Sequence, residues 1–310
     1  MKKIASLSAI GYDLGRSQTI DTLDFLKNDP DTLEVYRKAG AKYYAASEIS
    51  NIDLCASAIE KTLKETSISK DEIDVVLYVS ENATRGYSIS IIDANKLLLK
   101  VGLKKALPIG VSLSDCANII TGLQVGVSMI ASGMANNVLL VCSDMITGED
   151  KKRKMERETA IFSDGAVSCI LSKPGNGDFD ICSLNNENKP TLWEQNAETD
   201  EYEYSMEKFK IIHRISRAIL KENALKPIEI KKVFTSNYTL ATNKLFVKMT
   251  GCGKDKGFYD NIGRFGHTLA GDILINLKDF YKNNEIHSGD TFLSLVDSYS
   301  TCGAIVFCKV

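Results

Sequence analysis

A faint internal repeat, offset by half the chain, is the feature that most restricts the possible folds. The segment SAIEKTLKETSISKDEIDVVLYVSEN begins at Ser57, and SRAILKENALKPIEIKKVFTSNYT begins at Ser216. Each predicts a helix, a short polar break, Glu-Ile and a strand, and Glu72 in the first copy corresponds to Glu229 in the second. Internal repeats of this kind indicate that one structural unit occurs twice.

A second pair of segments keeps almost the same offset. SGMANNVLLVCSD begins at Ser132 and SGDTFLSLVDS begins at Ser288, and a Gly-Ala strand follows each of them, from Gly165 and Gly303. The order of the elements therefore agrees between the copies. One offset that holds across several elements favours two similar halves over a chance match between two helix–strand units.

Both halves alternate continuous apolar strands, such as VVLYV, with helical patterns. Such strands are typical of sheets that are buried on both faces. We therefore predict a layered α/β fold with a pseudo-twofold axis between the halves. Pro174, Gly175 and Gly177 cluster where a linker is expected, so we expect one half over 1–173 and the other over 178–310.

Composition excludes several classes of function. The chain has 310 residues and a net charge of −2, which gives no indication of a nucleic-acid or membrane partner. No apolar run approaches the ~18 residues of a membrane span. The eight cysteines contain no CxxC pair, so we expect no metal site. Without an export signal, free thiols indicate a cytoplasmic protein.

Cys116 lies at the start of a predicted helix in SLSDCANIITGLQVG. The corresponding segment of the second half, NIGRFGHTLAGDILINL, places His267 at the equivalent helix start, so the pseudo-twofold axis would bring the two side chains together. A helix N-terminus and an imidazole should lower the pKa of a thiol. We expect Cys116 to be a nucleophile, with its N–H stabilising an oxyanion, and His267 to be the base.

Two carboxylates are candidates to orient His267. Asp272 follows it five residues later in GHTLAGD, and an acid at an apolar helix start needs a partner. Asp297 lies in LSLVDSYSTCG, a connection that should close over the site. Either carboxylate could fix the imidazole tautomer, although Asp297 could instead cap the backbone of a turn. We prefer Asp272.

The segment DCANIITGLQVGVSMIASGMANNVLLVCSDM, the turn from Phe162 to Ala166 and the segments RFGHTLAGD and HSGDTFLSLV resemble the β-ketoacyl-acyl carrier protein synthase III family of the thiolase superfamily. The resemblance extends over almost the whole chain. It implies a five-layer α-β-α-β-α fold, a homodimer and an acyl thioester on Cys116. It also implies an acyl-coenzyme A or acyl carrier protein thioester as donor substrate, with no bound cofactor.

The departures from this family bear on the reaction. Condensing members have a histidine in a Pro-His-Gln-Ala-Asn turn, and its position falls here on Ser236, or on Asn237 with a slip of one residue. Their Gly-Asn-Thr turn is Gly-His-Thr around His267, and a run of glycines is replaced by Asp-Ser-Tyr ending at Tyr299. We expect Ser236, Asn237 and Tyr299 to contact the substrate.

In condensing members, the histidine and asparagine that are absent here hold a malonyl thioester while carbon dioxide is lost. Acyl transfer needs only a thiolate, an oxyanion hole and a base. A Gly-His turn is similar to that of the synthase III-like branch that acylates oxygen or nitrogen in natural-product pathways. We therefore expect an acyltransferase in a secondary-metabolite or fatty-acid-like pathway, acting on a hydroxyl, an amine or a carrier thiol. Two alternatives stay open: a decarboxylating synthase III with a modified site, and a catalytically silent subunit of a ketosynthase heterodimer.

Two basic regions could meet the donor. Lys244 and Lys248 lie one helical turn apart, where they could contact the acidic helix of an acyl carrier protein or form a solvated face. The basic run over 151–154 lies where the family contacts coenzyme A. A basic loop suits a phosphate-bearing donor.

Overall fold

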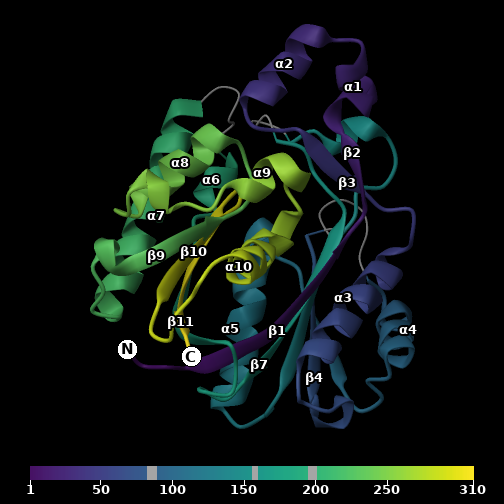
Figure 1. Ribbon diagram of the computed structural model, residues 1–310, viewed down its shortest axis with the longest axis vertical. Coiled ribbons are helices and arrows are strands. Elements are labelled where there is room, and N and C mark those ends of the chain that lie inside the picture. The colour runs from purple at the N-terminus through teal and green to yellow at the C-terminus, as the bar shows by residue number, and fades with distance from the viewer. Residues whose placement is uncertain (82–88, 156–159, 195–200) are drawn as a thin grey trace.

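The computed structural model describes residues 1–81, 89–155, 160–194 and 201–310 (Figure 1). Its strands are β1 (Ala5–Leu14), β2 (Arg16–Thr19), β3 (Tyr43–Ala46), β4 (Val75–Val79), β5 (Leu107–Val111), β6 (Val138–Asp144), β7 (Gly165–Ser172), β8 (Phe179–Asn188), β9 (Ile230–Thr235), β10 (Thr291–Asp297) and β11 (Thr301–Lys309). Its helices are α1 (Asp24–Lys27), α2 (Pro30–Lys38), α3 (Asn51–Glu65), α4 (Ile91–Val101), α5 (Asn118–Ala131), α6 (Thr191–Glu194), α7 (Glu201–Glu222), α8 (Leu240–Met249), α9 (Asp260–Phe265) and α10 (Asp272–Asn283). Within these ranges, no helix has the length and apolar character needed to span a bilayer.

Nine strands join in the order β5-β4-β6-β7-β1-β8-β11-β10-β9. Counted outward from the β1–β8 contact, β7, β6 and β4 have the same arrangement as β11, β10 and β9, and β5 is an additional strand at the edge of the first half. β6 is antiparallel to β7 and parallel to β4, and β10 is correspondingly antiparallel to β11 and parallel to β9. This equivalence confirms the pseudo-twofold relation that the repeat predicts.

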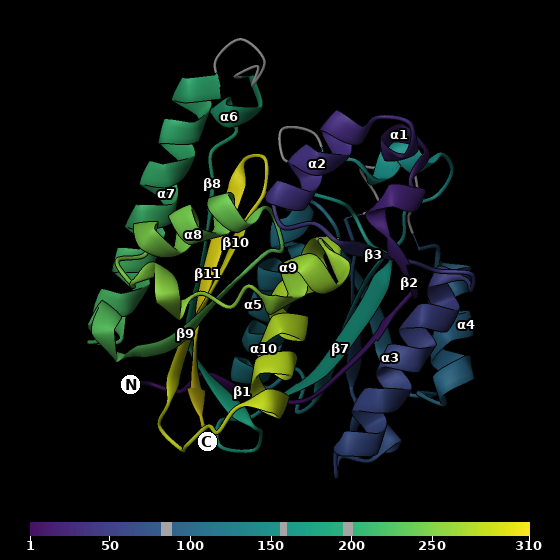
Figure 2. The same ribbon diagram turned by 45° about the horizontal axis from the view of Figure 1, so that its top comes forward.

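The helices form three layers around the strands, as the five-layer prediction requires (Figure 2). α3 and α4 cover the strands of the first half, and α7 and α8 cover those of the second half (Figure 1). α5 and α10 lie in the centre, where α5 contacts strands of both halves and α10 contacts β1, β9 and β10. Apolar side chains of α5 and α10, including Ile120, Leu123, Ile273 and Leu277, belong to one buried cluster. Burial of such side chains is the main favourable contribution to folding.

Local signals fix the ends of the helices that cover the first half. The Ser50 side chain accepts from the Asp53 N–H at the start of α3, and Ser90 and Asp93 cap each other at the start of α4. α4 ends at Gly102, whose φ of 78° is the left-handed conformation common at helix C-termini. These caps hold the outer layer in register with the strands that lead to the site.

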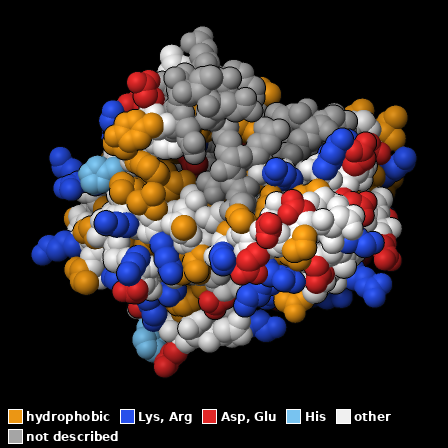
Figure 3. Space-filling model, turned by 90° about the horizontal axis from the view of Figure 1, so that it is seen from above, with side chains coloured by type: hydrophobic (Ala, Val, Ile, Leu, Met, Phe, Trp, Pro, Cys, Tyr) orange, Lys and Arg blue, Asp and Glu red, His pale blue; other side chains and the backbone are white. Residues whose placement is uncertain are grey.

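Residues 173–178 connect β7 to β8, and so join the two sets of strands. On the molecular face seen in Figure 3, basic and acidic side chains are interspersed. This distribution agrees with the small net charge of −2. A mixed surface of this kind produces no extended field of one sign.

Candidate active site

Cys116 lies in a 3-10 turn, Asp115–Ala117, that leads directly into α5. Asp115, the residue before the thiol, has a φ of 53°, which is an uncommon conformation for a residue with a side chain. The Asn118 side chain holds the turn, because its Oδ1 accepts from Ser114 N at 2.8 Å and its Nδ2 donates to Ser80 O at 3.1 Å. Strained backbone that is fixed by its surroundings often occurs at functional sites.

His267 belongs to the second half, but its backbone is bound to the first half. Its N–H donates to Ile161 O at 3.0 Å, and its carbonyl accepts from Ser163 N at 2.8 Å. Gly266 precedes it with a φ of 72°, and a Cβ at this position would lie 2.7 Å from Ile161 O. Only glycine therefore allows the backbone to approach closely enough for this bridge.

The structure brings Cys116, His267 and Asp272 together, with His267 in contact with the other two. Cys116 Sγ lies 3.4 Å from His267 Nε2, and His267 Nδ1 lies 2.5 Å from Asp272 Oδ2. All three side chains are buried. The rings of Phe162 and Tyr238 pack on the imidazole, with centroid distances of 5.5 and 5.0 Å. This is the geometry of a nucleophile, a base and an orienting carboxylate.

Asp272 is held from several directions. Its Oδ1 accepts from Thr268 N at 2.8 Å and from Thr268 Oγ1 at 2.6 Å. Its Oδ2 accepts from Asn237 N at 2.6 Å, and Asn237 Nδ2 donates to Oδ1 at 3.2 Å. With His267, these donors fix the carboxylate in one orientation, so the Nδ1 side of the imidazole is fixed as well.

Asp297 is the candidate that the structure excludes as the partner of His267. Its carboxylate pairs with Lys208 Nζ of α7 at 2.7 Å and accepts from Cys302 Sγ at 2.9 Å. Burial is the largest single effect on the pKa of Lys208 and lowers it, but the electrostatic contributions of Asp297 and its neighbours together outweigh burial, and the pKa is raised. The expectation that Asp297 orients the imidazole is therefore wrong, because a buried ammonium ion holds this carboxylate instead.

The three residues expected to contact substrate lie in two connections. Ser236 and Asn237 follow β9 and are buried. Asn237 turns its backbone and side-chain N–H groups toward Asp272, so we assign it to holding that carboxylate instead of substrate. Tyr299 lies between β10 and β11, with its N–H 3.5 Å from Asp115 Oδ2. Substrate contact by Ser236 and Tyr299 stays a prediction.

Glu81 is a member of the site that sequence reasoning missed. It follows β4 and is 1% exposed, and its Oε2 accepts from the Cys116 thiol at 3.0 Å. Asp144, at the end of β6, fixes the Glu81 backbone by accepting its N–H at 2.8 Å. The available signal was an acid directly after the apolar run VVLYVS, where a buried carboxylate needs a partner.

The pKa of the thiol differs in direction from the expectation. Burial and the nearby carboxylates of Glu81 and Asp115 raise the pKa of Cys116 well above its usual value. The predicted lowering was therefore wrong, because two nearby negative charges and desolvation outweigh the partial positive charge of a helix N-terminus. This shift favours the neutral thiol over the thiolate.

The basic run over 151–154 contains one structural residue. The Arg153 guanidinium is buried and pairs with both oxygens of Asp164, at 3.0 and 2.8 Å. Lys151, Lys152 and Lys154 are exposed. Only these lysines are therefore placed to meet a donor from solution.

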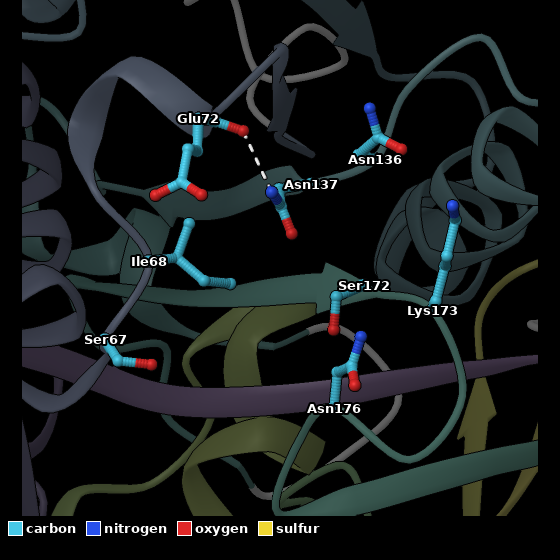
Figure 4. A pocket seen from close by; sticks show the side chains of 8 residues that line it. All are labelled: Ser67, Ile68, Glu72, Asn136, Asn137, Ser172, Lys173 and Asn176. Carbon is cyan, nitrogen blue, oxygen red and sulfur yellow. Dashed lines mark hydrogen bonds between the residues drawn. The ribbon is translucent and has the colours of Figure 1, made fainter.

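Two further features bear on ligands. In the described ranges, one group of potential metal ligands has atoms within 4.8 Å of one another, and it consists of Glu81, Asp115 and Cys116. An ion held there would occupy the thiol itself. Figure 4 shows a separate polar cavity of about 450 Å³. Its lining residues are Ser67, Ile68, Glu72, Asn136, Asn137, Ser172, Lys173 and Asn176. None of them belongs to the Cys116 cluster.

Comparison with known proteins shows what the chain is similar to in sequence and in fold. A model of 3-oxoacyl-[acyl-carrier-protein] synthase III matches residues 112–190. A β-ketoacyl-[acyl-carrier-protein] synthase III of Fusobacterium nucleatum is 23% identical over 269 residues, which are 80% of either chain. The 2-heptyl-4(1H)-quinolone synthase subunit PqsC of Pseudomonas aeruginosa is 27% identical over 145 residues, which are 44% of this chain and 40% of PqsC. The solved structure of ChlB3, an acyltransferase, superposes with a TM-score of 0.85 at 14% identity, over 99% of this chain and 98% of ChlB3.

Proposed function

The chain is a β-ketoacyl-acyl carrier protein synthase III-like protein of the thiolase superfamily, and we propose that it acts as an acyltransferase through an acyl-enzyme on Cys116. The acceptor is a hydroxyl, an amine or a carrier thiol. The observation that carries this proposal is the line from Cys116 Sγ to His267 Nε2 at 3.4 Å and from His267 Nδ1 to Asp272 Oδ2 at 2.5 Å. A buried nucleophile with an oriented base is sufficient for acyl transfer.

In the first half-reaction, Cys116 attacks the carbonyl carbon of a donor thioester. His267 Nε2 takes the thiol proton as the S–C bond forms, and Asp272 stabilises the imidazolium ion. The Cys116 N–H donates to none of the described residues, so it can stabilise the oxyanion of the tetrahedral intermediate. The donor thiolate then leaves and takes the proton from His267, which leaves a neutral imidazole and an acyl-enzyme.

In the second half-reaction, the acceptor attacks the Cys116 thioester. Neutral His267 removes the proton of the attacking hydroxyl, amine or thiol, and the intermediate expels the Cys116 thiolate. The imidazolium ion returns its proton to the sulfur, which restores the resting thiol. A raised thiol pKa favours this return, because the negative charges of Glu81 and Asp115 disfavour the thiolate product.

Two features of the site speak against decarboxylative condensation. By the resemblance, the position of the histidine of condensing members falls on Ser236, or on Asn237 with a slip of one residue, and neither side chain can carry a positive charge. Glu81 and Asp115 also place two carboxyl groups beside the sulfur. A malonyl donor would bring a third carboxylate into a buried region, where repulsion between like charges is strong. A neutral or cationic acceptor meets no such repulsion.

We infer that the donor is a coenzyme A or acyl carrier protein thioester. Exposed Lys151, Lys152 and Lys154 lie on the segment that leads to Ile161, to which the His267 backbone is bonded. Exposed Lys244 and Lys248 lie on α8, which begins close after the buried turn at Ser236. Clusters of ammonium groups near the site favour an anionic donor from either source.

We also infer that the protein forms a homodimer through β5. This strand is at one edge of the nine-stranded sheet, so its outer N–H and C=O groups have no partner strand among the described strands. The Leu107 side chain on it is 58% exposed, and Leu113 just beyond it is 95% exposed. An open edge with exposed apolar side chains favours pairing with a second copy.

Loading of the thiol tests the proposal. Wild-type protein is incubated with acyl-coenzyme A and acyl carrier protein thioesters of different chain length, and its intact mass is measured. We expect one acyl adduct that maps to Cys116, and none in Cys116→Ala. His267→Ala should slow loading by about 10²–10⁴-fold.

Cys142→Ala is the matched control, because Cys142 is also a buried cysteine with a raised pKa. It should load like the wild type. A protein that no donor acylates, or that is acylated equally in the Cys116→Ala variant, would disprove the assignment of the nucleophile and favour the silent-subunit alternative.

A further inference from the structure

A row of buried polar side chains extends from the active site toward the molecular surface along α9 and α10, two helices near the centre of Figure 2. α10 contributes Asp272, Asn276 and Asp279, which share one helix face because they are four and three residues apart. α9 contributes Asn261. These four residues are at most 4% exposed, so each side chain needs a partner inside the protein.

The inner part of the row meets the orienting carboxylate. Asn276 Nδ2 donates to Asn237 Oδ1 at 2.9 Å and to Thr235 O at 3.0 Å. Asn237 in turn donates to Asp272 through its backbone N–H at 2.6 Å and through Nδ2 at 3.2 Å. Asn276 is therefore connected through Asn237 to the Asp272 carboxylate that holds His267.

The outer part of the row ends at an ion pair. Asn261 Nδ2 donates to Asn276 Oδ1 at 2.7 Å and to Asp279 Oδ2 at 2.9 Å. Arg264 Nη1 donates to Asn261 Oδ1 at 3.0 Å and to Asp279 Oδ2 at 2.6 Å. Tyr12 Oη donates to Asp279 Oδ1 at 2.7 Å, and the Arg264 side chain is 49% exposed. The row thus connects the site to solvent-exposed charge.

Groups that can play only one hydrogen-bonding role fix the direction of this row. The Thr235 carbonyl only accepts, so the Asn276 amide must present its NH₂ group there and toward Asn237 Oδ1. Arg264 only donates, so Asn261 must present its oxygen to Arg264 and its NH₂ group to Asn276. Asn237 is then left with its NH₂ group toward Asp272. Chains of hydrogen bonds with one consistent direction strengthen one another in a buried setting.

We propose that Asn276 is a positioning residue for the Cys116–His267 pair. It acts through Asn237 by keeping the NH₂ group of that amide toward Asp272, so that the carboxylate stays aligned with His267 Nδ1 and Nε2 stays directed at the thiol. This inference rests on the proposed role of Cys116 and His267. It adds a residue that touches neither substrate nor either reacting side chain.

Asn276→Asp tests the direction of the row. The variant can still accept from Asn261 Nδ2, but it cannot donate to Asn237 Oδ1 or to the Thr235 carbonyl. We expect the rate of Cys116 alkylation by iodoacetamide, followed by peptide mass mapping, to fall at least 10-fold relative to the wild type. The downfield proton resonance of the short His267 Nδ1–Asp272 hydrogen bond should also be lost or shifted.

Asn223→Asp is the matched control. Asn223 is also a buried asparagine of the second half, in the turn directly after α7, and its Nδ2 donates to the Ser183 side chain and to Ile219 O. Replacing it should lower stability to a similar degree but leave alkylation within twofold of the wild type and the resonance unchanged. If Asn276→Asp and Asn223→Asp lost reactivity to the same extent, Asn276 would contribute only to stability, and the proposal would be overturned.

Asn276→Leu keeps the test valid if the aspartate variant does not fold. Leucine has similar size and no hydrogen-bonding groups, so Asn237 would lose its fixed direction without a new charge, and an intermediate loss of alkylation rate is expected. A wild-type Cys116 that reacts no faster than the other cysteines would contradict the proposed function. A fast-reacting wild type with equal rates and an unchanged resonance in both Asn276 variants would contradict only the positioning role.

Discussion

At the scale of single residues, burial of the Cys116 sulfur and the carboxylates beside it together favour the neutral thiol. Glu81 Oε2 lies 3.0 Å from Sγ, whereas the base His267 lies at 3.4 Å. Burial and the carboxylates of Glu81 and Asp115 raise the pKa of the thiol. In the mechanism that we propose, the site therefore differs from one that stores a thiolate, since the nucleophile would form only when His267 takes the proton during attack.

Glu81→Gln should make Cys116 more reactive toward a simple alkylating agent. Removing the carboxylate removes a cause of the raised pKa, so the thiolate fraction at any pH below that pKa increases. We expect the alkylation rate of the wild type to keep rising through pH 9, and that of Glu81→Gln to be about 10-fold higher at pH 8. Pseudo-first-order alkylation rates measured across pH check both points. A wild-type plateau near pH 6 would instead indicate a stored thiolate–imidazolium pair.

Asp272→Asn and Asp297→Asn should separate two carboxylates that the sequence left as alternatives. Asp272→Asn replaces the acceptor of His267 Nδ1, so we expect acyl transfer to fall by about 10²–10⁴-fold with little loss of donor binding. Asp297→Asn leaves buried Lys208 without its charge partner, which should cost about 3–5 kcal/mol of unfolding free energy. Single-turnover rates and urea unfolding of both variants check this. Equal kinetic loss in folded forms of both variants would contradict the assignment.

At the scale of secondary-structure elements, the fold could be predicted because the order of helices and strands is repeated in the two halves. Contacts between elements that are distant in the sequence could not be predicted. The segments that contain Cys116 and His267 could be matched because each leads into the strand of its own half. Glu81 enters the site from the end of β4, and no local pattern marks it as a neighbour of the thiol. The Lys208–Asp297 pair similarly depends on how α7 packs on β10. Sequence reasoning therefore gave the wrong direction for the thiol pKa.

The open edge of β5 leads to a prediction about assembly. Leu107→Asp with Leu113→Asp would place two charges along the exposed apolar edge, where they would have to be buried on dimer formation. We expect light scattering to give twice the chain mass of 34.1 kDa for the wild type and the single chain mass for the double variant. Ile228→Asp is the control, since Ile228 is 77% exposed outside this edge. A wild-type protein with the mass of one chain would contradict the β5 interface.

At the scale of the whole molecule, the eight buried cysteines couple stability to alkaline pH. Burial raises the pKa of Cys55, Cys169 and Cys182 to about 12, and it raises those of the other five as well. The folded pKa values lie above those of the unfolded chain. The stability is therefore complete below about pH 8.5 and is lost as pH rises from there toward the folded values.

Urea unfolding between pH 8 and 10.5, in reductant and at constant protein concentration, measures this effect. Each cysteine should contribute a loss of up to about 1.4 kcal/mol per pH unit. Cys169→Ala should show a shallower dependence on pH by about that amount, even though the cavity lowers its stability at pH 8. An unfolding free energy that stays constant over this pH range would show that the thiols have the same pKa values in the folded and the unfolded protein.

The central claim is that the acyl group on Cys116 passes to an acceptor without formation of a carbon–carbon bond. The most direct measurement is a chase of isolated acyl-enzyme, with intact mass and carbon dioxide release recorded together. We expect the adduct to persist, without release of carbon dioxide, when malonyl thioester is added, and we expect a small hydroxyl, amine or carrier-thiol acceptor to discharge it. Discharge by malonyl thioester with one carbon dioxide released per adduct would contradict the account and make the protein a condensing enzyme.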